Sequence, residues 1–103
     1  MVVIRRINLE PIQEQVIRLT KKSQILSVGS SYDTVYLNVT MDTRLERTEE
    51  CYVLMVREGI DTGSYPIDTY IGSTDIVTER TVGNPDSIVS VHLFKLIPPR
   101  NYG

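Results

Sequence analysis

Cysteine, tryptophan and long apolar runs are scarce or missing in this chain. Its 103 residues include one cysteine, Cys51, and no tryptophan. A single cysteine closes no intramolecular disulfide, so we expect a reducing, cytoplasmic environment and a buried thiol that behaves as a small apolar side chain. No apolar run reaches the roughly 18 to 20 residues that span a bilayer, and Val2 to Arg6 does not read as a signal peptide. We therefore expect neither membrane association nor export.

An excess of positive charge is also missing. The formal net charge is −2 and the sequence pI is about 5.3. Nucleic-acid-binding domains attract the phosphate backbone through a basic field, so we expect no general DNA or RNA binding. The eleven lysines and arginines are spread unevenly, and Arg57 and Arg80 flank the ends of predicted strands. A small anion could therefore still find a site.

Residue sets that carry catalysis are sparse. His92 is the only histidine, and one histidine with one distant cysteine makes no zinc site. Cys51 lies in an apolar run, where burial raises the pKa of a thiol and lowers its reactivity. A hydrolase could pair two of the loop carboxylates, such as Asp61 and Asp68, but solvated loop acids are far commoner. We expect a protein that is not an enzyme and that needs no cofactor or metal.

Short apolar runs separated by turn residues make up most of the chain. Between Val35 and Met41 apolar and polar residues alternate, which predicts a strand with one buried face. Cys51 to Val56 is apolar on both faces, which predicts a central strand or a strand at a subunit interface. Further strands are predicted over residues 1–9, 15–19, 24–28, 70–77 and 88–97. A hairpin turn is predicted over 29–33, a solvated charged link over 43–50 and a long loop over 57–68.

This pattern predicts an all-β fold. No stretch of ten or more residues has the helical period. We expect a small antiparallel β-sandwich or barrel of six to eight strands, with at most one short helix. Residues 1–103 would form a single β domain whose tail, 97–103, is frayed.

The segment Tyr70 to Leu96 holds the residues around which the fold is expected to form. It contains the only histidine, His92, and the only phenylalanine, Phe94. Gly72 interrupts the first strand of the segment, where a neighbouring backbone or a ligand could approach closely. Residues 83–85, Gly-Asn-Pro, predict a turn between the two strands.

Three short pieces of the sequence resemble a family of small uncharacterised proteins from phages and bacteria, a domain of unknown function. The pieces are Gln24-Ile25-Leu26-Ser27-Val28, Tyr70-Ile71-Gly72-Ser73-Thr74 and Val91-His92-Leu93-Phe94-Lys95. The resemblance covers about residues 7–97 and implies a phage or prophage origin, and hence a host-cell cytoplasm, without implying a reaction. Members of the family carry a Thr-Gly-His loop where this chain has Glu58-Gly59-Ile60-Asp61. That difference removes a polar residue from any site carried over from the family.

Two functions follow as hypotheses. In the first, a homo-oligomeric phage protein acts as a sponge that sequesters a small anionic nucleotide signal of host immunity. Arg57 and Arg80 would bind its phosphates, Tyr70 would stack on its base and His92 would add a hydrogen bond. In the second, the chain is a protein-interaction module, a minor virion component or an inhibitor of a host protein. His92 has an alternative interpretation outside a ligand site. It could be a core or interface histidine that makes one hydrogen bond.

Overall fold

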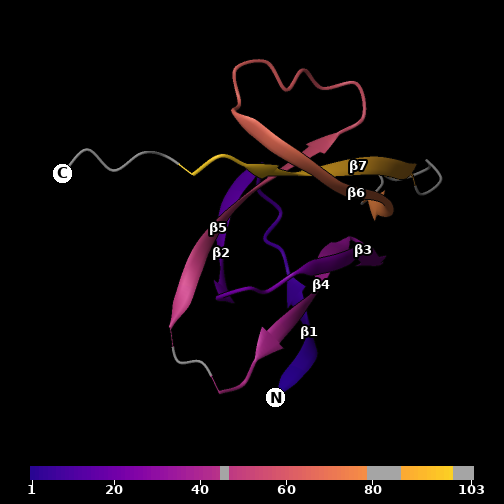
Figure 1. Cartoon of the computed structure of the whole chain (residues 1–103). Helices are drawn as coiled ribbons and strands as arrows, with labels where there is room; N and C mark the ends of the chain where they lie inside the picture. Colours follow the sequence, from indigo (N-terminus) through magenta and orange to yellow (C-terminus); the bar gives the residue numbers. More distant parts are fainter. Residues whose placement is uncertain (45–46, 79–86, 99–103) are drawn as a thin grey trace.

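The computed structural model describes residues 1–44, 47–78 and 87–98, which form seven strands (Figure 1). The strands are β1 (Val2–Asn8), β2 (Glu14–Thr20), β3 (Ile25–Ser31), β4 (Thr34–Asp42), β5 (Thr48–Arg57), β6 (Ile67–Thr78) and β7 (Ser87–Leu96). The described residues contain no helix, and therefore none long and apolar enough to cross a membrane. The prediction of an antiparallel all-β fold with six to eight strands is confirmed.

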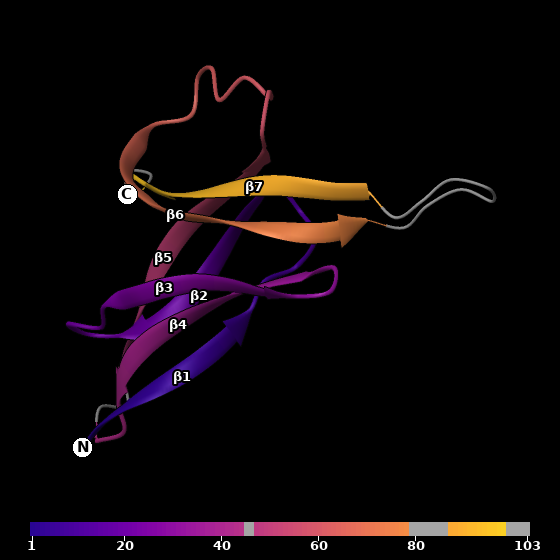
Figure 2. The same ribbon diagram turned by 90° about the vertical axis from the view of Figure 1, so that its right-hand side faces the viewer.

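Two antiparallel sheets pack face to face. One has the strand order β1-β4-β3 and the other has the order β2-β5-β7-β6. Figure 2 shows β6 and β7 above the layer that contains β1, β3 and β4. The alternation predicted for β4 is confirmed, because Val35, Leu37 and Val39 are buried against the other sheet. The facing core side chains include Val53 on β5 and Leu93 on β7, both fully buried. Burial of each such side chain stabilises the fold by roughly 1.5 to 3 kcal/mol.

The apolar strand β5 lies inside its sheet, between β2 and β7. The prediction of a central strand over Cys51 to Val56 is therefore confirmed. The predicted charged link over 43–50 is too long, because β5 begins at Thr48. Its first residues pair with β2, and Arg18 faces Glu50 with an N–O distance of 3.5 Å. The composition of residues 48–50 predicts a solvated loop. Backbone pairing with β2 and this ion pair place them in the sheet instead.

The two sheets meet along one side, where β3 lies next to β6. The backbone N–H of Val77 donates to the carbonyl of Tyr32 at 3.0 Å, and the Ser30 hydroxyl donates to the carbonyl of Asp75 at 2.6 Å. A Cβ on Gly72 would lie 3.1 Å from a methyl carbon of Val28 on β3. A close approach thus occurs at Gly72, but the neighbour is the side chain of Val28 and not the backbone or ligand that was predicted.

The hairpin predicted over 29–33 is confirmed but tighter, since β3 continues through Ser31 and the turn consists of Tyr32 and Asp33. Tyr32 has a positive φ of 61°, a conformation uncommon for a bulky residue. On the outer side of β3 the ring of Tyr36 covers Gly29, where a Cβ would lie 2.5 Å from the ring. The guanidinium carbon of Arg6 lies 3.9 Å from the centre of the same ring.

Two predictions fall partly or wholly outside the described residues. The turn at 83–85 is one of them. Of the predicted tail, 99–103 lie outside the description, whereas Ile97 donates its backbone N–H to the carbonyl of Pro66 at 2.8 Å.

Candidate functional site

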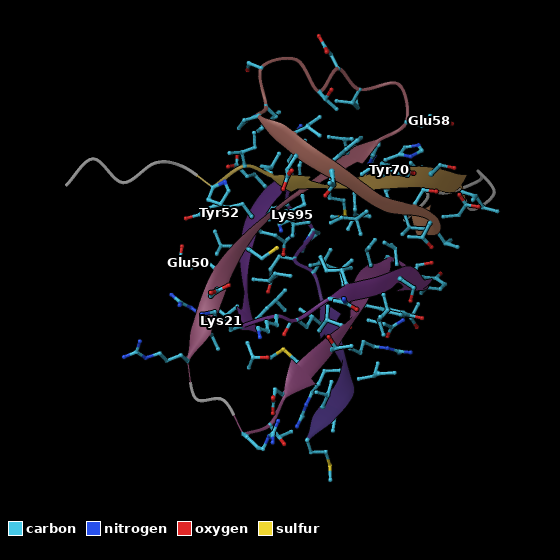
Figure 3. All side chains as sticks on the ribbon, in the orientation of Figure 1. Lys21, Glu50, Tyr52, Glu58, Tyr70 and Lys95 are labelled. Carbon is cyan, nitrogen blue, oxygen red and sulfur yellow. The ribbon has the colours of Figure 1, made fainter. Side chains whose placement is uncertain are left out.

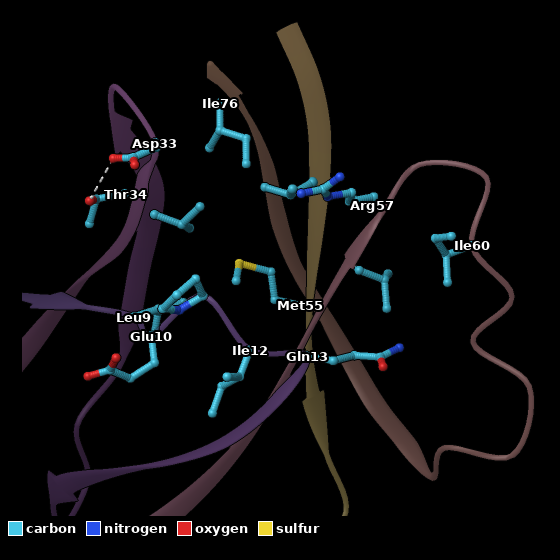
Figure 4. A pocket seen from close by; sticks show the side chains of 14 residues that line it. Leu9, Glu10, Ile12, Gln13, Asp33, Thr34, Met55, Arg57, Ile60 and Ile76 are labelled. Carbon is cyan, nitrogen blue, oxygen red and sulfur yellow. Dashed lines mark hydrogen bonds between the residues drawn. The ribbon is translucent and has the colours of Figure 1, made fainter. Parts of the chain in front are cut away.

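A cleft opens between the two sheets at one end of the sandwich (Figure 4). Its volume is about 400 Å³, which falls in the range of small-molecule sites. The three-stranded side supplies the segment after β1 and the β3–β4 turn. The four-stranded side supplies the end of β5, the loop that follows it, and parts of β6 and β7. The cleft lies where strands of both sheets end, so its walls come from segments far apart in the sequence.

The cleft has an apolar floor and a charged rim. Leu9, Val35 and Val91 reach it from the core, and Figure 4 shows Met55 between the two sheets. The described residues of the lining include three charged side chains: Arg57 at the end of β5, Glu10 after β1 and Asp33 in the β3–β4 turn. Figure 4 places Arg57 and Asp33 on opposite sides, and the Thr34 hydroxyl donates to Asp33 Oδ1 at 3.4 Å. An apolar body with both anionic and hydrogen-donating groups would match this lining.

The outer face of the four-stranded sheet carries a second group of residues, which we call the aromatic ledge: Tyr70 on β6 with His92 and Phe94 on β7. Tyr70 stands opposite Phe94 in the ladder, and their ring centres are 5.2 Å apart in an edge-to-face arrangement. The Tyr70 hydroxyl lies 3.0 Å from His92 Nδ1, within hydrogen-bond distance. His92 Nε2 lies 3.7 Å from a carboxylate oxygen of Glu58, which begins the loop after β5 (Figure 3).

A small apolar cluster lies beside the ledge on the same outer face. Leu54, Val56 and Leu96 are buried there under Tyr52, Tyr65 and Phe94. Tyr65 belongs to the loop between β5 and β6, so this loop covers part of the face. The Tyr52 hydroxyl donates to Glu50 at 2.8 Å, and this hydrogen bond raises the pKa of Tyr52 (Figure 3). The double-sided apolar character of β5 therefore comes from a core on each side of one sheet.

The structure brings together two of the four residues predicted to bind a ligand. Tyr70 and His92 are partners in the aromatic ledge. Arg57 points the other way: it pairs with Val91 in the ladder, whereas its neighbour Val56 pairs with His92. Because side chains alternate along a strand, Arg57 reaches the cleft and His92 reaches the outer face. Arg80 lies outside the described residues. Ligand binding by these residues stays a prediction.

His92 does not lie in the main core. Its side chain is 30% exposed, and it contacts Tyr70 and Glu58 on the outer side of the sheet. The distance to Glu58 exceeds a hydrogen bond, and the pair lies away from the cleft. Among the residues that the structure describes, His92 therefore has no acid partner within the cleft.

The described residues contain no group of three or more His, Cys, Asp or Glu side chains that could hold a metal ion. Cys51 is buried on the inner side of β5, and this burial raises the pKa of its thiol, against the opposing effect of Lys95. His92 lies on the other side of the sheet, so no Cys–His pair forms.

Sequence reasoning missed most of the cleft. Glu10, Asp33 and Met55 belong to three separate segments, and each reads as an ordinary strand or turn residue. The available signals were Pro11, which ends the first strand pattern, and the turn residues around Asp33. Both mark strand ends, but neither indicates that the two ends meet.

A scan against protein-family models and searches of curated proteins and of solved structures found no match.

Proposed function

We propose that this chain is a non-enzymatic binding protein whose ligand enters the cleft between the two sheets and binds Arg57. The observation that supports this most is the cleft itself, with its apolar floor and a guanidinium at its rim. We expect such a site to hold a ligand without transforming it, since no described residue of its lining is a nucleophile paired with a base. Arg57 offers a planar fork of donors that matches a phosphate or carboxylate.

A small nucleotide fits the chemistry of this lining. A base could lie against Met55 and Ile76, and Arg57 would bind a phosphate. Glu10 and Asp33 would accept hydrogen bonds from amino or ribose hydroxyl groups. Because two carboxylates accompany one guanidinium, a single phosphodiester is favoured over a triphosphate, whose charge these acids would repel.

Sequestration of an immune signal in a host cell is the role that we propose for such binding. The resemblance to phage proteins supports this role, and so does a cleft of small-molecule size that contains Arg57. In the proposed homo-oligomer, Tyr70 and His92 of one subunit would reach the ligand only if the outer face of that subunit packed beside the cleft of the next. Light scattering tests whether the chain forms this homo-oligomer. A monomer at high concentration would contradict the site shared between subunits, and binding in the cleft of one chain would then be tested by itself.

Isothermal titration with cyclic mononucleotides, cyclic dinucleotides and ADP-ribose tests the ligand class. We expect at least one to bind, and Arg57→Gln to weaken it about tenfold or more, because a charged hydrogen bond is lost. Arg18→Gln is the matched control, since Arg18 is an exposed arginine of β2 outside the cleft. The proposal fails if no compound gives heat, or if both variants bind like the wild type.

A protein-interaction role is the second candidate, and strand β1 supports it. β1 is an edge strand of its sheet, and Val2 and Ile4 on it are 61% and 68% exposed. An apolar edge strand is a template for a strand of another protein. If a host protein binds there, Ile4→Lys should abolish its recovery in a pull-down. Ile88→Lys, at an equally exposed apolar position on β7, should not. Equal loss in both variants would contradict binding at β1.

A further inference from the structure

Tyr70 is an exposed side chain that is held in place. It is 54% exposed, yet its hydroxyl bonds His92 Nδ1 at 3.0 Å and its ring meets Phe94 at 5.2 Å. An exposed tyrosine without such contacts samples several rotamers. Contacts at both ends of the ring lower the entropic cost of using it as a binding surface.

Polar groups continue from this ring along the same face. Beyond the pair Tyr70 and Phe94, Ser73 stands opposite His92 and Asp75 stands opposite Ser90. The Ser90 hydroxyl donates to Asp75 Oδ1 at 2.7 Å. A β-bulge between Tyr70 and Gly72 shifts the alternation, so Ser73 and Asp75 share the outer face with Tyr70. The face thus runs from a stacking ring to a line of hydroxyl, imidazole and carboxylate groups.

The charge beside this line is negative. Glu58 lies next to His92, and Asp75 lies at the far end of the line. These carboxylates repel phosphate, sulfate and acidic sugars, and they accept hydrogen bonds from hydroxyl groups. An ammonium group would also be attracted to these carboxylates and to the exposed ring of Tyr70, so a cation is the competing ligand. A neutral ring rich in hydroxyl groups is the ligand that would use the ring and the whole line of hydrogen-bonding groups together.

We propose that this outer face binds a neutral oligosaccharide, with one sugar ring stacked on Tyr70. The C–H groups of a sugar ring carry partial positive charge and are attracted to the negative face of the aromatic ring. Hydroxyl groups of the next sugar would bond Ser73, Asp75 and Glu58. His92 acts as a positioning residue that fixes the Tyr70 hydroxyl. Within one chain this site is separate from the cleft at Arg57, and a sugar bound there would compete with packing of the same face against the cleft of a neighbouring subunit.

Titration of isotope-labelled protein with maltohexaose, cellohexaose, chitohexaose and a mannose hexamer, followed by NMR, tests the proposal. We expect at least one oligomer to shift the backbone signals of Tyr70, Ser73 and Ser90. Tyr70→Ala should weaken its binding at least tenfold. Tyr32→Ala is the matched control, because Tyr32 is a more exposed tyrosine in the β3–β4 turn. Arg57→Gln should leave the sugar affinity unchanged, which separates this site from the cleft.

Three results would overturn the proposal. One is the absence of shifts with every oligomer at about 20 mM, a concentration at which a site with a Kd near 1 mM would be almost fully occupied. Another is equal weakening by Tyr70→Ala and Tyr32→Ala. The third is binding of a lysine hexamer, but of no sugar, at the Tyr70 face, which would identify a cation site. Circular dichroism of Tyr70→Ala confirms that the variant is folded, as expected for a side chain more than half exposed.

Discussion

The two sheets of this sandwich have very different outer faces. On the four-stranded sheet, Leu54 and Leu96 are buried beneath a loop, and Tyr70 lies at the margin of that cover. On the three-stranded sheet the same side of the strands carries polar side chains, as where Asn38 donates to the Ser27 hydroxyl at 2.9 Å. No loop provides an apolar cover there among the described residues, and the side chain of Tyr36 lies flat on Gly29 instead.

This difference shows how a small chain divides its surface. The long β5–β6 loop carries Tyr65 onto one sheet and gives that sheet two cores. Beside this loop, the side chains of Tyr70 and Glu58 remain accessible, and both contact His92. The three-stranded sheet is solvated on its outer side, and its ends supply Glu10 and Asp33 to the lining of the cleft.

The largest effect should separate the two outer faces directly. Leu54→Ala removes a fully buried side chain beneath the loop and should lower the free energy of unfolding by about 2 to 5 kcal/mol. Asn38→Ala, on the outer side of β4, loses one exposed hydrogen bond and should cost less than about 1 kcal/mol. Urea denaturation measures both. Similar costs would show that the loop does not create a second core.

A smaller effect is expected at Gly29. Gly29→Ala forces the Tyr36 ring away from the strand and breaks its contact with Arg6, at a cost of about 0.5 to 1 kcal/mol. The same change in a Tyr36→Ala background should cost nothing further, because the obstructing ring is gone. Urea denaturation of the four proteins gives the coupling. Additive costs would contradict the close contact.

Tyr70→Phe should have a still smaller effect. It removes the hydroxyl that bonds His92 but keeps the ring against Phe94, so we expect a loss of about 0.5 kcal/mol. The NMR signals of the His92 ring should shift at the same time. An unchanged His92 spectrum would show that the hydrogen bond is absent in solution.

The smallest effect concerns pH. Hydrogen bonds from the Arg44 side chain and then its backbone hold the pKa of Asp42 well below its usual range. A folded-state pKa below the unfolded one stabilises the fold above the ordinary carboxyl pKa of about 4, and this contribution is lost as the pH falls. At pH 7 the urea midpoint of the wild type should therefore be higher than that of Asp42→Asn. At pH 3 the difference between the two midpoints should be smaller. A margin independent of pH would contradict the account.

Much of the fold could be predicted because the strands keep a simple period. Val35, Leu37 and Val39 alternate with polar residues, and their burial follows directly. The two-sided burial of β5 was also readable, since Cys51 to Val56 has no polar side except the tyrosine hydroxyl. The start of β5 could not be predicted, because Glu49 and Glu50 are charged. They belong to the strand through backbone pairing with β2 and not through a strand-like residue type.

The candidate sites were harder to predict because both depend on register. A bulge between Tyr70 and Gly72 decides which later side chains share the outer face with Tyr70, and Gly72 was interpreted only as a point of close approach. Ser73 and Asp75 lie there for this reason, whereas Ile76 turns inward toward the cleft. Arg57 and His92 were predicted to share one ligand, but their ladder positions place them on opposite sides of the sheet.

The central claim is that a small nucleotide binds in the cleft beside Arg57, and chemical-shift mapping tests it most directly. The protein is titrated with the tightest-binding compound of the nucleotide panel, and backbone signals are followed by NMR. The account predicts shifts at Glu10, Asp33, Met55 and Arg57, and none of comparable size along β1. Shifts confined to β1 or to the Tyr70 face, with an unperturbed cleft, would contradict it.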